Sequence, residues 1–182
     1  MSGEEERVVV LASLREKPTL EAMAKLLYFD HCCKDTPIRL VVDVDTGSAT
    51  AGMAVLGVMS EISAPVHTHC AGSAHYVAAA VVAAGAAGHR SAVANADFWI
   101  VGPPPCPAES KPEGLLALVK EWGAARKRRK QRDALLHDLL DALARATRQP
   151  APNLLLDLSE GVRLSGPEAK SYGLVDVLVD EP

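Results

Sequence analysis

Aromatic residues are scarce in this chain, at only 4% of the sequence, so its core must be built from Ala, Val and Leu. Long apolar runs are missing as well. The longest, Val77 to Ala87, is well short of the ~20 residues that a membrane helix needs. Met1 to Arg7 is acidic and precedes a short strand-like run, which excludes the pattern of a signal peptide. We therefore expect a soluble, cytoplasmic protein that makes no membrane contact.

Disulfide spacing and an excess of positive charge are also absent. The four cysteines include an adjacent pair and no CxxC pair, so we expect free thiols in a reducing compartment: Cys32, Cys33, Cys70 and Cys106. The net charge of -4 excludes the global basic field that nucleic-acid-binding domains carry. With 48% hydrophobic residues, the 182 residues are enough for one core, which predicts a single domain over residues 1–182.

Short β-branched runs alternate with segments of helical periodicity. The runs predict strands at Val8–Leu11, Ile38–Val44, Val66–Cys70, Arg90–Val93, Asp97–Val101 and Leu174–Val179. The periodic segments predict helices at Thr19–Cys32, Ala49–Ile62, Tyr76–Ala87 and Glu113–Thr147, with a short helix between Ser165 and Gly173. Pro18 suits a helix start just before Thr19, and the prolines between residues 103 and 112 predict a loop. Strand–helix alternation implies right-handed crossovers and a mostly parallel α/β sheet.

Several segments, in this order along the chain, resemble the Clp protease proteolytic subunit family. They are Gly47 to Ala54, Gly72 to Tyr76, Ala84 to Arg90, Thr147 to Pro150 and Ser165 to Asp176. Each motif alone is weak, and the last also occurs in crotonases, but the ordered set covers nearly the whole chain. The resemblance implies a ClpP/crotonase-like fold of repeated β-β-α units. Its head would comprise residues 1–102 and 150–182, and residues 103–149 would form a protruding handle with one long helix.

The resemblance also implies an assembly. Members of the family form rings that stack in pairs through the handle helix, and an ATP-driven AAA+ unfoldase feeds the enclosed chamber. An apolar stripe on the predicted handle is expected to face the opposite ring: Leu135, Leu136, Leu139, Leu140 and Leu143. An isolated helix of this length would expose too much apolar surface as a monomer, so oligomerisation is expected on physical grounds too.

The family's catalytic serine and histidine are not found where the resemblance places them. In the family, the serine attacks the peptide carbonyl, the histidine takes its proton and an aspartate orients the histidine. An alignment without gaps through Gly88 to Arg90 puts Tyr76 at the serine position and Val101 at the histidine position. Counting back from Ser165 puts Asp157 at the aspartate position. The resemblance thus implies that peptidase activity is lost and that no catalytic residue remains functional.

The turn that would hold the oxyanion also departs from the family pattern. Its positions are Thr46, Gly47 and Val77, and Thr46-Gly47 replaces a Gly-Gly pair whose first β-carbon-free position permits close backbone approach. Ser73 and His75 offer a substitute pair, but the hydroxyl of Ser73 is expected to be displaced by several ångströms, beyond the ~1 Å that such chemistry tolerates. The side chain at position 76 is instead expected to fill the vacated volume and to hydrogen-bond through its hydroxyl.

Histidines gather around one predicted strand. His67 and His69 share a strand face and suit two zinc ligands, with Cys70 or His75 as a further candidate. Strand alternation sends Cys70 to the opposite face, and no second ligand pair has zinc spacing. We therefore favour histidines at a strand surface or an interface, and expect neither a metal nor a cofactor.

Two sets of charged residues are further candidates for a binding or catalytic site. Asp43 and Asp45 alternate on one strand face and suit a divalent or acid–base site, or simply a solvated strand end. The block from Arg126 to Arg132 holds six cations in seven residues, which suits nucleic acid, a facing subunit or solvent. No aromatic residue interleaves it for base stacking, so a solvated helix face is favoured and nucleic acid is not expected as a partner.

Together, these patterns predict a non-catalytic structural or regulatory subunit of a Clp-type proteolytic ring, in partnership with an active Clp proteolytic subunit. One alternative is a homo-oligomeric binding protein outside proteolysis. A second is a crotonase-like enzyme acting on acyl thioesters, which the short chain and long handle disfavour. A third is an ATP-dependent serine-type peptidase that retains activity through a non-standard site.

Overall fold

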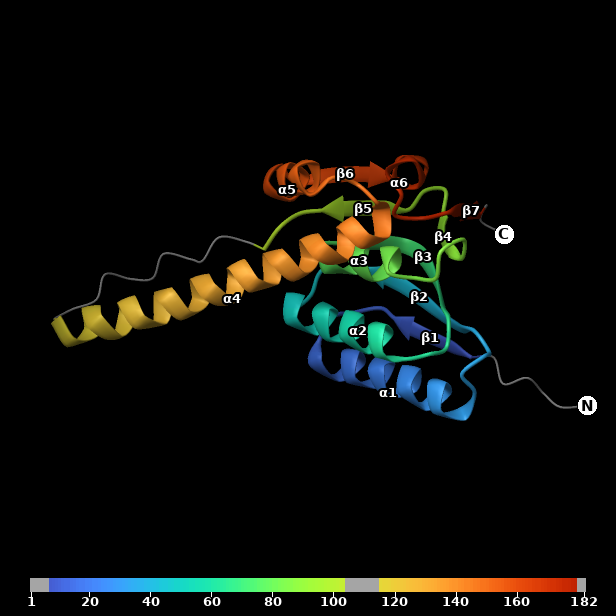
Figure 1. The fold of residues 1–182 in the computed structure, drawn as a ribbon, viewed down its shortest axis with the longest axis horizontal. Coiled ribbons are helices and arrows are strands. Elements are labelled where there is room, and N and C mark those ends of the chain that lie inside the picture. Colours follow the sequence, from blue (N-terminus) through green and yellow to red (C-terminus); the bar gives the residue numbers. More distant parts are fainter. Residues whose placement is uncertain (1–6, 104–114, 180–182) are drawn as a thin grey trace, which may run out of the picture.

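The computed structural model of the protein describes residues 7–103 and 115–179. Within these residues, seven strands form one sheet (Figure 1). Its main path runs in the order β1 (Val8–Leu11), β2 (Ile38–Val44), β3 (Val66–His75), β4 (Arg90–Val93) and β7 (Val177–Val179), and β5 (Asp97–Ile100) and β6 (Val162–Ser165) branch from β3. All strand pairs are parallel except β5 with β6. The prediction of a mostly parallel α/β sheet is confirmed.

The central strand β3 is longer than predicted, because it continues past Cys70, where the predicted strand ends, as far as His75. Its first half pairs with β4 and its second half with β5. A register shift against β2 between Val42 and Val44 accommodates this change of partner. Gly72 leaves room there for the Asp43 carboxylate, which would have to shift if residue 72 carried a β-carbon, since that carbon would lie 2.7 Å from it. As a result, β2, β3 and β5 all end near one edge of the sheet.

Three helices, α1 (Glu16–Cys32), α2 (Ala49–Glu61) and α3 (Val77–Ala83), contribute to the apolar core on one side of the sheet. All seven residues of α3 are buried, and they are only Ala and Val, which lets the helix pack closely. It ends earlier than predicted, because Ala86 returns to donate a backbone hydrogen bond to Val66 (2.8 Å). Helix α1 begins earlier than predicted and holds Pro18 in its first turn, where a backbone N–H has no intrahelical partner to lose.

Helix α4 (Leu115–Thr147) projects far beyond the remaining described chain (Figure 1). Its 33 residues correspond to about 50 Å of helix, which agrees with the long helix predicted there. The expected contact of its leucine stripe with an opposite ring is wrong for the C-terminal part of the stripe. Leu139 and Leu143 are at most 1% exposed and belong to the protein's own core, with Leu136 and Leu140 packed against it. These side chains are buried because α4 crosses α3 and α5 at the head. The predicted proline loop lies almost entirely outside the described residues.

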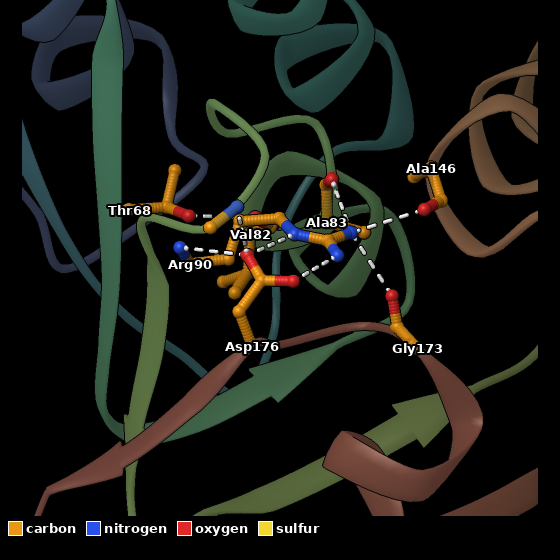
Figure 2. Close-up of polar contacts among 8 residues, drawn as sticks. Thr68, Val82, Ala83, Arg90, Ala146, Gly173 and Asp176 are labelled. Atoms are coloured by element: carbon orange, nitrogen blue, oxygen red, sulfur yellow. Dashed lines mark hydrogen bonds and ion pairs between the residues drawn. The ribbon is translucent and has the colours of Figure 1, made fainter.

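Arg90 anchors the base of α4 to the sheet (Figure 2). Its buried guanidinium donates to the backbone carbonyls of Ala83 (3.3 Å), Ala146 (3.0 Å) and Gly173 (2.9 Å), and it forms a two-pronged ion pair with Asp176. The Arg90 side chain, through its hydrogen bonds, holds the pKa of Asp176 down at about 2. We call these five residues the Arg90 junction. It ties α3, α4 and the C-terminal segment into one unit.

The C-terminal segment contains a helix and a strand that the sequence patterns did not predict, α5 (Ala151–Glu160) and β6. The short helix α6 (Gly166–Tyr172) follows as predicted. Its capping box is present, with the Glu168 carboxylate accepting from the Ser165 N–H (2.8 Å), and Gly173 ends it at φ 94°. Strand β7 begins only at Val177, later than predicted, because Asp176 is held by the Arg90 junction. In the described part of the chain, no helix is both long and apolar enough to cross a bilayer.

Candidate functional site

Tyr76 stands at a sharp turn between β3 and α3. Its backbone has φ 58° and ψ -121°, a region that L residues rarely adopt and that costs about 1–3 kcal/mol. Its N–H donates to the carbonyl of Trp99 in β5 (2.7 Å), which fixes the turn against the neighbouring strand. The fold therefore presents the residue at position 76 at the carboxyl end of the central strand, on a strained turn.

Backbone hydrogen bonds bring the other two positions that the resemblance assigns to the triad, Val101 and Asp157, to the same edge. Val101 follows β5 directly, two residues after the Trp99 carbonyl that holds Tyr76. The next residue, Gly102, donates to the carbonyl of Leu158 (2.7 Å), the neighbour of Asp157 in α5. Tyr76, Val101 and Asp157 thus belong to three segments that meet at one edge of the sheet, which we call the Tyr76 edge.

The chemistry of Tyr76 is that of a packed side chain. Its ring lies against the core, and its hydroxyl is buried without a hydrogen-bond partner among the described residues. The expectation that this hydroxyl would be hydrogen-bonded is wrong. Burial raises the pKa of Tyr76 to about 12, so the phenol stays protonated at neutral pH.

Neither of the other two positions supplies a base to that hydroxyl. Val101 has an aliphatic side chain with no proton acceptor. The Asp157 carboxylate accepts a hydrogen bond from the Tyr172 hydroxyl (2.5 Å). Burial, together with this bond, raises the pKa of Tyr172. Asp157 is therefore held by a tyrosine of α6, where the family pattern has it orient a histidine.

Ser73 and His75 do not form a substitute catalytic pair. The Ser73 hydroxyl donates to the Asp43 carboxylate (3.1 Å), which also accepts from the Ser73 N–H (2.9 Å). His75 contacts the Asp45 carbonyl through Nδ1 (3.0 Å) and the Asp97 carboxylate through Nε2 (2.8 Å). Both ring nitrogens face acceptors, so His75 is held in place and neither nitrogen is free to accept a proton from serine.

The predicted oxyanion turn is packed tightly against the rest of the fold. Gly47 forms a bridge with Leu14, and a β-carbon there would lie 2.3 Å from the Leu14 β-carbon. The exposed Thr46 hydroxyl donates to its neighbour Asp45 (3.3 Å). Val77 is fully buried, in the space that Gly52 leaves open. Gly47 therefore serves packing, and the side chain at position 46 occupies the exposed rim of the turn.

The metal candidates are dispersed. His67 stacks on His89 with ring centroids 4.0 Å apart, while Cys70 is fully buried on the core side and its thiol pKa is raised to about 12 by that burial. Among the residues that the structure describes, no group of three His, Cys, Asp or Glu side chains is placed to hold a metal ion. The basic block from residue 126 to residue 132 is on the projecting part of α4, where most of its side chains are exposed.

The protein thus has a mostly parallel α/β fold with a strained turn after its central strand. A helix that carries Asp157 lies beside this turn, and a long helix projects from the head. The family model for Clp protease matches residues 3–182. This chain belongs to the Clp protease family.

The chain is similar to two Clp protease subunits or subunit-related proteins. The ATP-dependent Clp protease proteolytic subunit-related protein 2, chloroplastic, of Arabidopsis thaliana is 30% identical over 185 residues, which cover 97% of this chain and 60% of the relative. The chain thus spans only 60% of that relative's length. The ATP-dependent Clp protease proteolytic subunit 2 of Corynebacterium jeikeium (strain K411) is 30% identical over 177 residues, covering 97% of this chain and 80% of the relative.

Sequence reasoning missed three of the contacts that define this edge. The bonds of Asp43 to Ser73, His75 to Asp97 and Tyr172 to Asp157 join residues that lie 15 to 30 positions apart. The first two follow once β3 is known to continue to His75, because that extension brings Ser73 beside Asp43 of β2 and His75 alongside β5, which carries Asp97. The third carries no local signal, since it depends on how α5 and α6 are placed relative to each other in the fold.

Proposed function

We propose that this Clp protease family member is a non-catalytic structural or regulatory subunit of an ATP-dependent proteolytic ring. The observation that carries the proposal is the Tyr76 hydroxyl, buried and without a hydrogen-bond partner among the described residues. A nucleophile needs a base within hydrogen-bond reach, roughly 2.6–3.2 Å. A phenol whose pKa is about 12 is also almost entirely un-ionised at neutral pH.

The surroundings of Tyr76 support loss of chemistry without loss of the fold. The strained backbone at position 76 is kept, although a packed tyrosine does not need it. The one acidic group at the family's catalytic positions, Asp157, is bonded to Tyr172 instead of a histidine. A scaffold that retains this geometry after its chemistry has gone is one that still has to fit a shared assembly.

Exposed apolar side chains support an assembly. Helix α1 presents Leu20, Leu27 and Tyr28 at 51–58% exposure, and α5 presents Leu155 and Leu156 at 45% and 55%. Apolar groups gathered on the outer side of a helix favour burial against another protein. We propose that they pack within a ring that contains an active Clp proteolytic subunit and that docks an AAA+ unfoldase.

The same proposal covers the organisation and setting of the chain. Residues 1–182 act as one domain, with a head of residues 1–102 and 150–182 and a handle of residues 103–149. Two exposed free thiols, at Cys32 and Cys33, support a reducing, cytoplasmic setting.

The test combines mass photometry with a fluorogenic-peptide assay. The chain is purified alone, and also together with the active Clp proteolytic subunit from the same genome. We expect the chain alone to leave the peptide uncut and to resist a fluorophosphonate probe, which labels activated serines. We expect the mixture to contain rings that incorporate this chain and that cleave the peptide.

Two outcomes would overturn the proposal in different ways. Labelling of any serine of this chain by the fluorophosphonate would establish a surviving hydrolase. A homogeneous ring that excludes the active subunit would point to a homo-oligomeric binding protein outside proteolysis.

A further inference from the structure

A basic hollow lies on the side of the sheet that faces away from the buried core. Its volume is about 480 Å³, and it is formed at the amino ends of β1, β2 and β3 together with β4 and β7. Its polar wall consists of Arg7, Arg39, His67, His69 and His89, and none of its eleven described lining residues is acidic. Tyr76 follows the other end of β3, so the hollow is separate from the Tyr76 edge.

The pairing of β2 with β3 brings the positively charged side chains together on one face of the sheet. Arg39 and His67 are paired across β2 and β3, so their side chains rise from the same face, and His69 follows on that face two residues later. Arg39 is exposed and makes no side-chain hydrogen bond or ion pair among the described residues. The guanidinium of Arg7, by contrast, is fixed by the carbonyls of Phe29, Cys33 and Thr36 at the end of α1. Arg39 is thus the cation in this hollow that is available to a ligand.

Hydrogen bonds fix the orientation of His69. The Ser91 hydroxyl donates to the carbonyl of Thr68 (3.2 Å), so its oxygen accepts from Nδ1 of His69 (2.9 Å). Nδ1 therefore carries a proton, and Nε2 is the nitrogen left for a ligand. Burial, with Arg39 nearby, lowers the pKa of His69, so the ring is mostly neutral without a ligand. A negatively charged ligand would favour its protonated form.

His67 is held in a similar state by its neighbour. Its ring is parallel to that of His89 within 2°, at a centroid distance of 4.0 Å. Two protonated rings in this stack would repel each other, and burial together with His89 lowers the pKa of His67. A bound anion would relieve that repulsion, so the hollow gains positive charge when such a ligand enters.

We propose that this hollow binds an acidic segment of a partner protein, whose carboxylates pair with Arg39 and the histidines. Valine and proline side chains border the positive groups, at Val8, Pro37 and Val177, which suits the aliphatic groups of a peptide. A single inorganic anion would leave most of the 480 Å³ unfilled. No Phe, Tyr or Trp lines the hollow for base stacking, which disfavours single-stranded nucleic acid. This inference does not depend on whether the protein is catalytic.

The probe for the test is a short fluorescein-labelled peptide of alternating glutamate and valine, followed by fluorescence anisotropy on the full chain. We expect binding at about pH 6 that weakens toward about pH 8, because bound carboxylates favour the protonated forms of His67 and His69, and these forms are lost as the pH rises. Arg39→Gln should weaken binding about tenfold, the value of one charge-assisted hydrogen bond. Lys25→Gln on α1 is the matched control, since it removes the same charge from an exposed position away from the hollow. Calorimetry in two buffers of different ionisation enthalpy should report net proton uptake on binding.

Other outcomes of this experiment would overturn the proposal or assign the hollow to a different ligand. Equal binding of a peptide with glutamine in place of every glutamate would overturn the proposal, as would equal losses in Arg39→Gln and Lys25→Gln. Complete displacement of the peptide by inorganic phosphate or by a short oligouridine, at lower concentration than the unlabelled peptide, would assign the hollow to those ligands instead. Arg39→Glu should abolish binding of the acidic peptide while leaving the melting temperature unchanged, which separates lost binding from lost folding.

Discussion

Arg90 and Tyr76 both carry buried polar atoms, but the fold satisfies these atoms to very different degrees. At the Arg90 junction, the guanidinium donates to three backbone carbonyls and to both oxygens of Asp176. At the Tyr76 edge, the phenol hydroxyl has no partner within the described residues, and the backbone beneath it is strained. One site has every reason to be kept for stability, whereas the other carries a cost that stability does not explain.

The difference shows which parts of the fold depend on a particular side chain. The Arg90 junction joins segments 86 residues apart, between residues 90 and 176, so any loss there is felt by the sheet, α4 and the C-terminal segment together. The Tyr76 edge is supported by backbone bonds that do not require a particular side chain at position 76. Substitution at the edge is therefore tolerated by the fold, and substitution at the junction is not.

The comparison is tested most directly by placing a serine and a histidine at the Tyr76 edge. In Tyr76→Ser combined with Val101→His, the strained turn would present a serine hydroxyl beside a base. We expect labelling by a fluorophosphonate probe on the order of 10²- to 10⁴-fold faster than in Tyr76→Ser alone, the usual contribution of a general base. Intact-mass spectrometry follows the labelling. Equal rates in the single and double variants would show that Val101 does not lie at the position of the base.

A substitution of Arg90, in contrast, is expected to lower only the stability of the fold. Arg90→Met leaves the partly buried Asp176 without its partner and three carbonyls without a donor, so we expect a loss of about 3 kcal/mol in the free energy of unfolding. Urea denaturation measures it. Arg145→Met is the matched control on α4, because the Arg145 side chain is exposed, and we expect a change within about 0.5 kcal/mol. Equal losses in both variants would contradict the assignment of the junction as the structural anchor.

Acid should weaken the same junction through Asp176. Its folded pKa of about 2 lies below the ordinary carboxyl value of about 3.9, so its contribution is fully present above that value and is lost as the pH falls toward 2. We expect the stability difference between the wild type and Asp176→Asn to narrow between about pH 4 and about pH 2. Urea denaturation at successive pH values follows this difference. A difference that stays constant over that window would mean that the carboxylate is not paired in the folded protein.

Local patterns in the sequence predict the parts of the fold that depend on near neighbours. The alternation in Ile38–Val44 gives that strand its observed bounds, and the spacing of Ser165 and Glu168 correctly predicts a capped helix. Both signals arise within a few residues. The extension of β3 to His75 depends instead on β5, which offers a second partner after β4 has ended. No pattern inside residues 71–75 reveals that partner.

The same limit applies to the Tyr76 edge. A motif alignment predicts which residues occupy the family's catalytic positions, but it does not predict what those residues contact. That Asp157 accepts from Tyr172 follows from the placement of α5 relative to α6, and α5 itself was not predicted. The unpartnered hydroxyl of Tyr76 is likewise a property of the surrounding core, which no single segment specifies.

The smallest expected effect comes from a substitution of Tyr76 itself, which tests its contrast with Arg90. Tyr76→Phe keeps the ring in the core and removes only the hydroxyl that lacks a partner, so we expect unfolding to cost up to about 1 kcal/mol more than in the wild type. Tyr172→Phe is the matched control, because it deletes a hydroxyl that donates to Asp157, and we expect it to lower stability by about 1.5–3 kcal/mol. Urea denaturation of the two variants therefore gives changes of opposite sign. A loss of stability in Tyr76→Phe would show that its hydroxyl is hydrogen-bonded in the folded protein, and the contrast with Arg90 would then no longer hold.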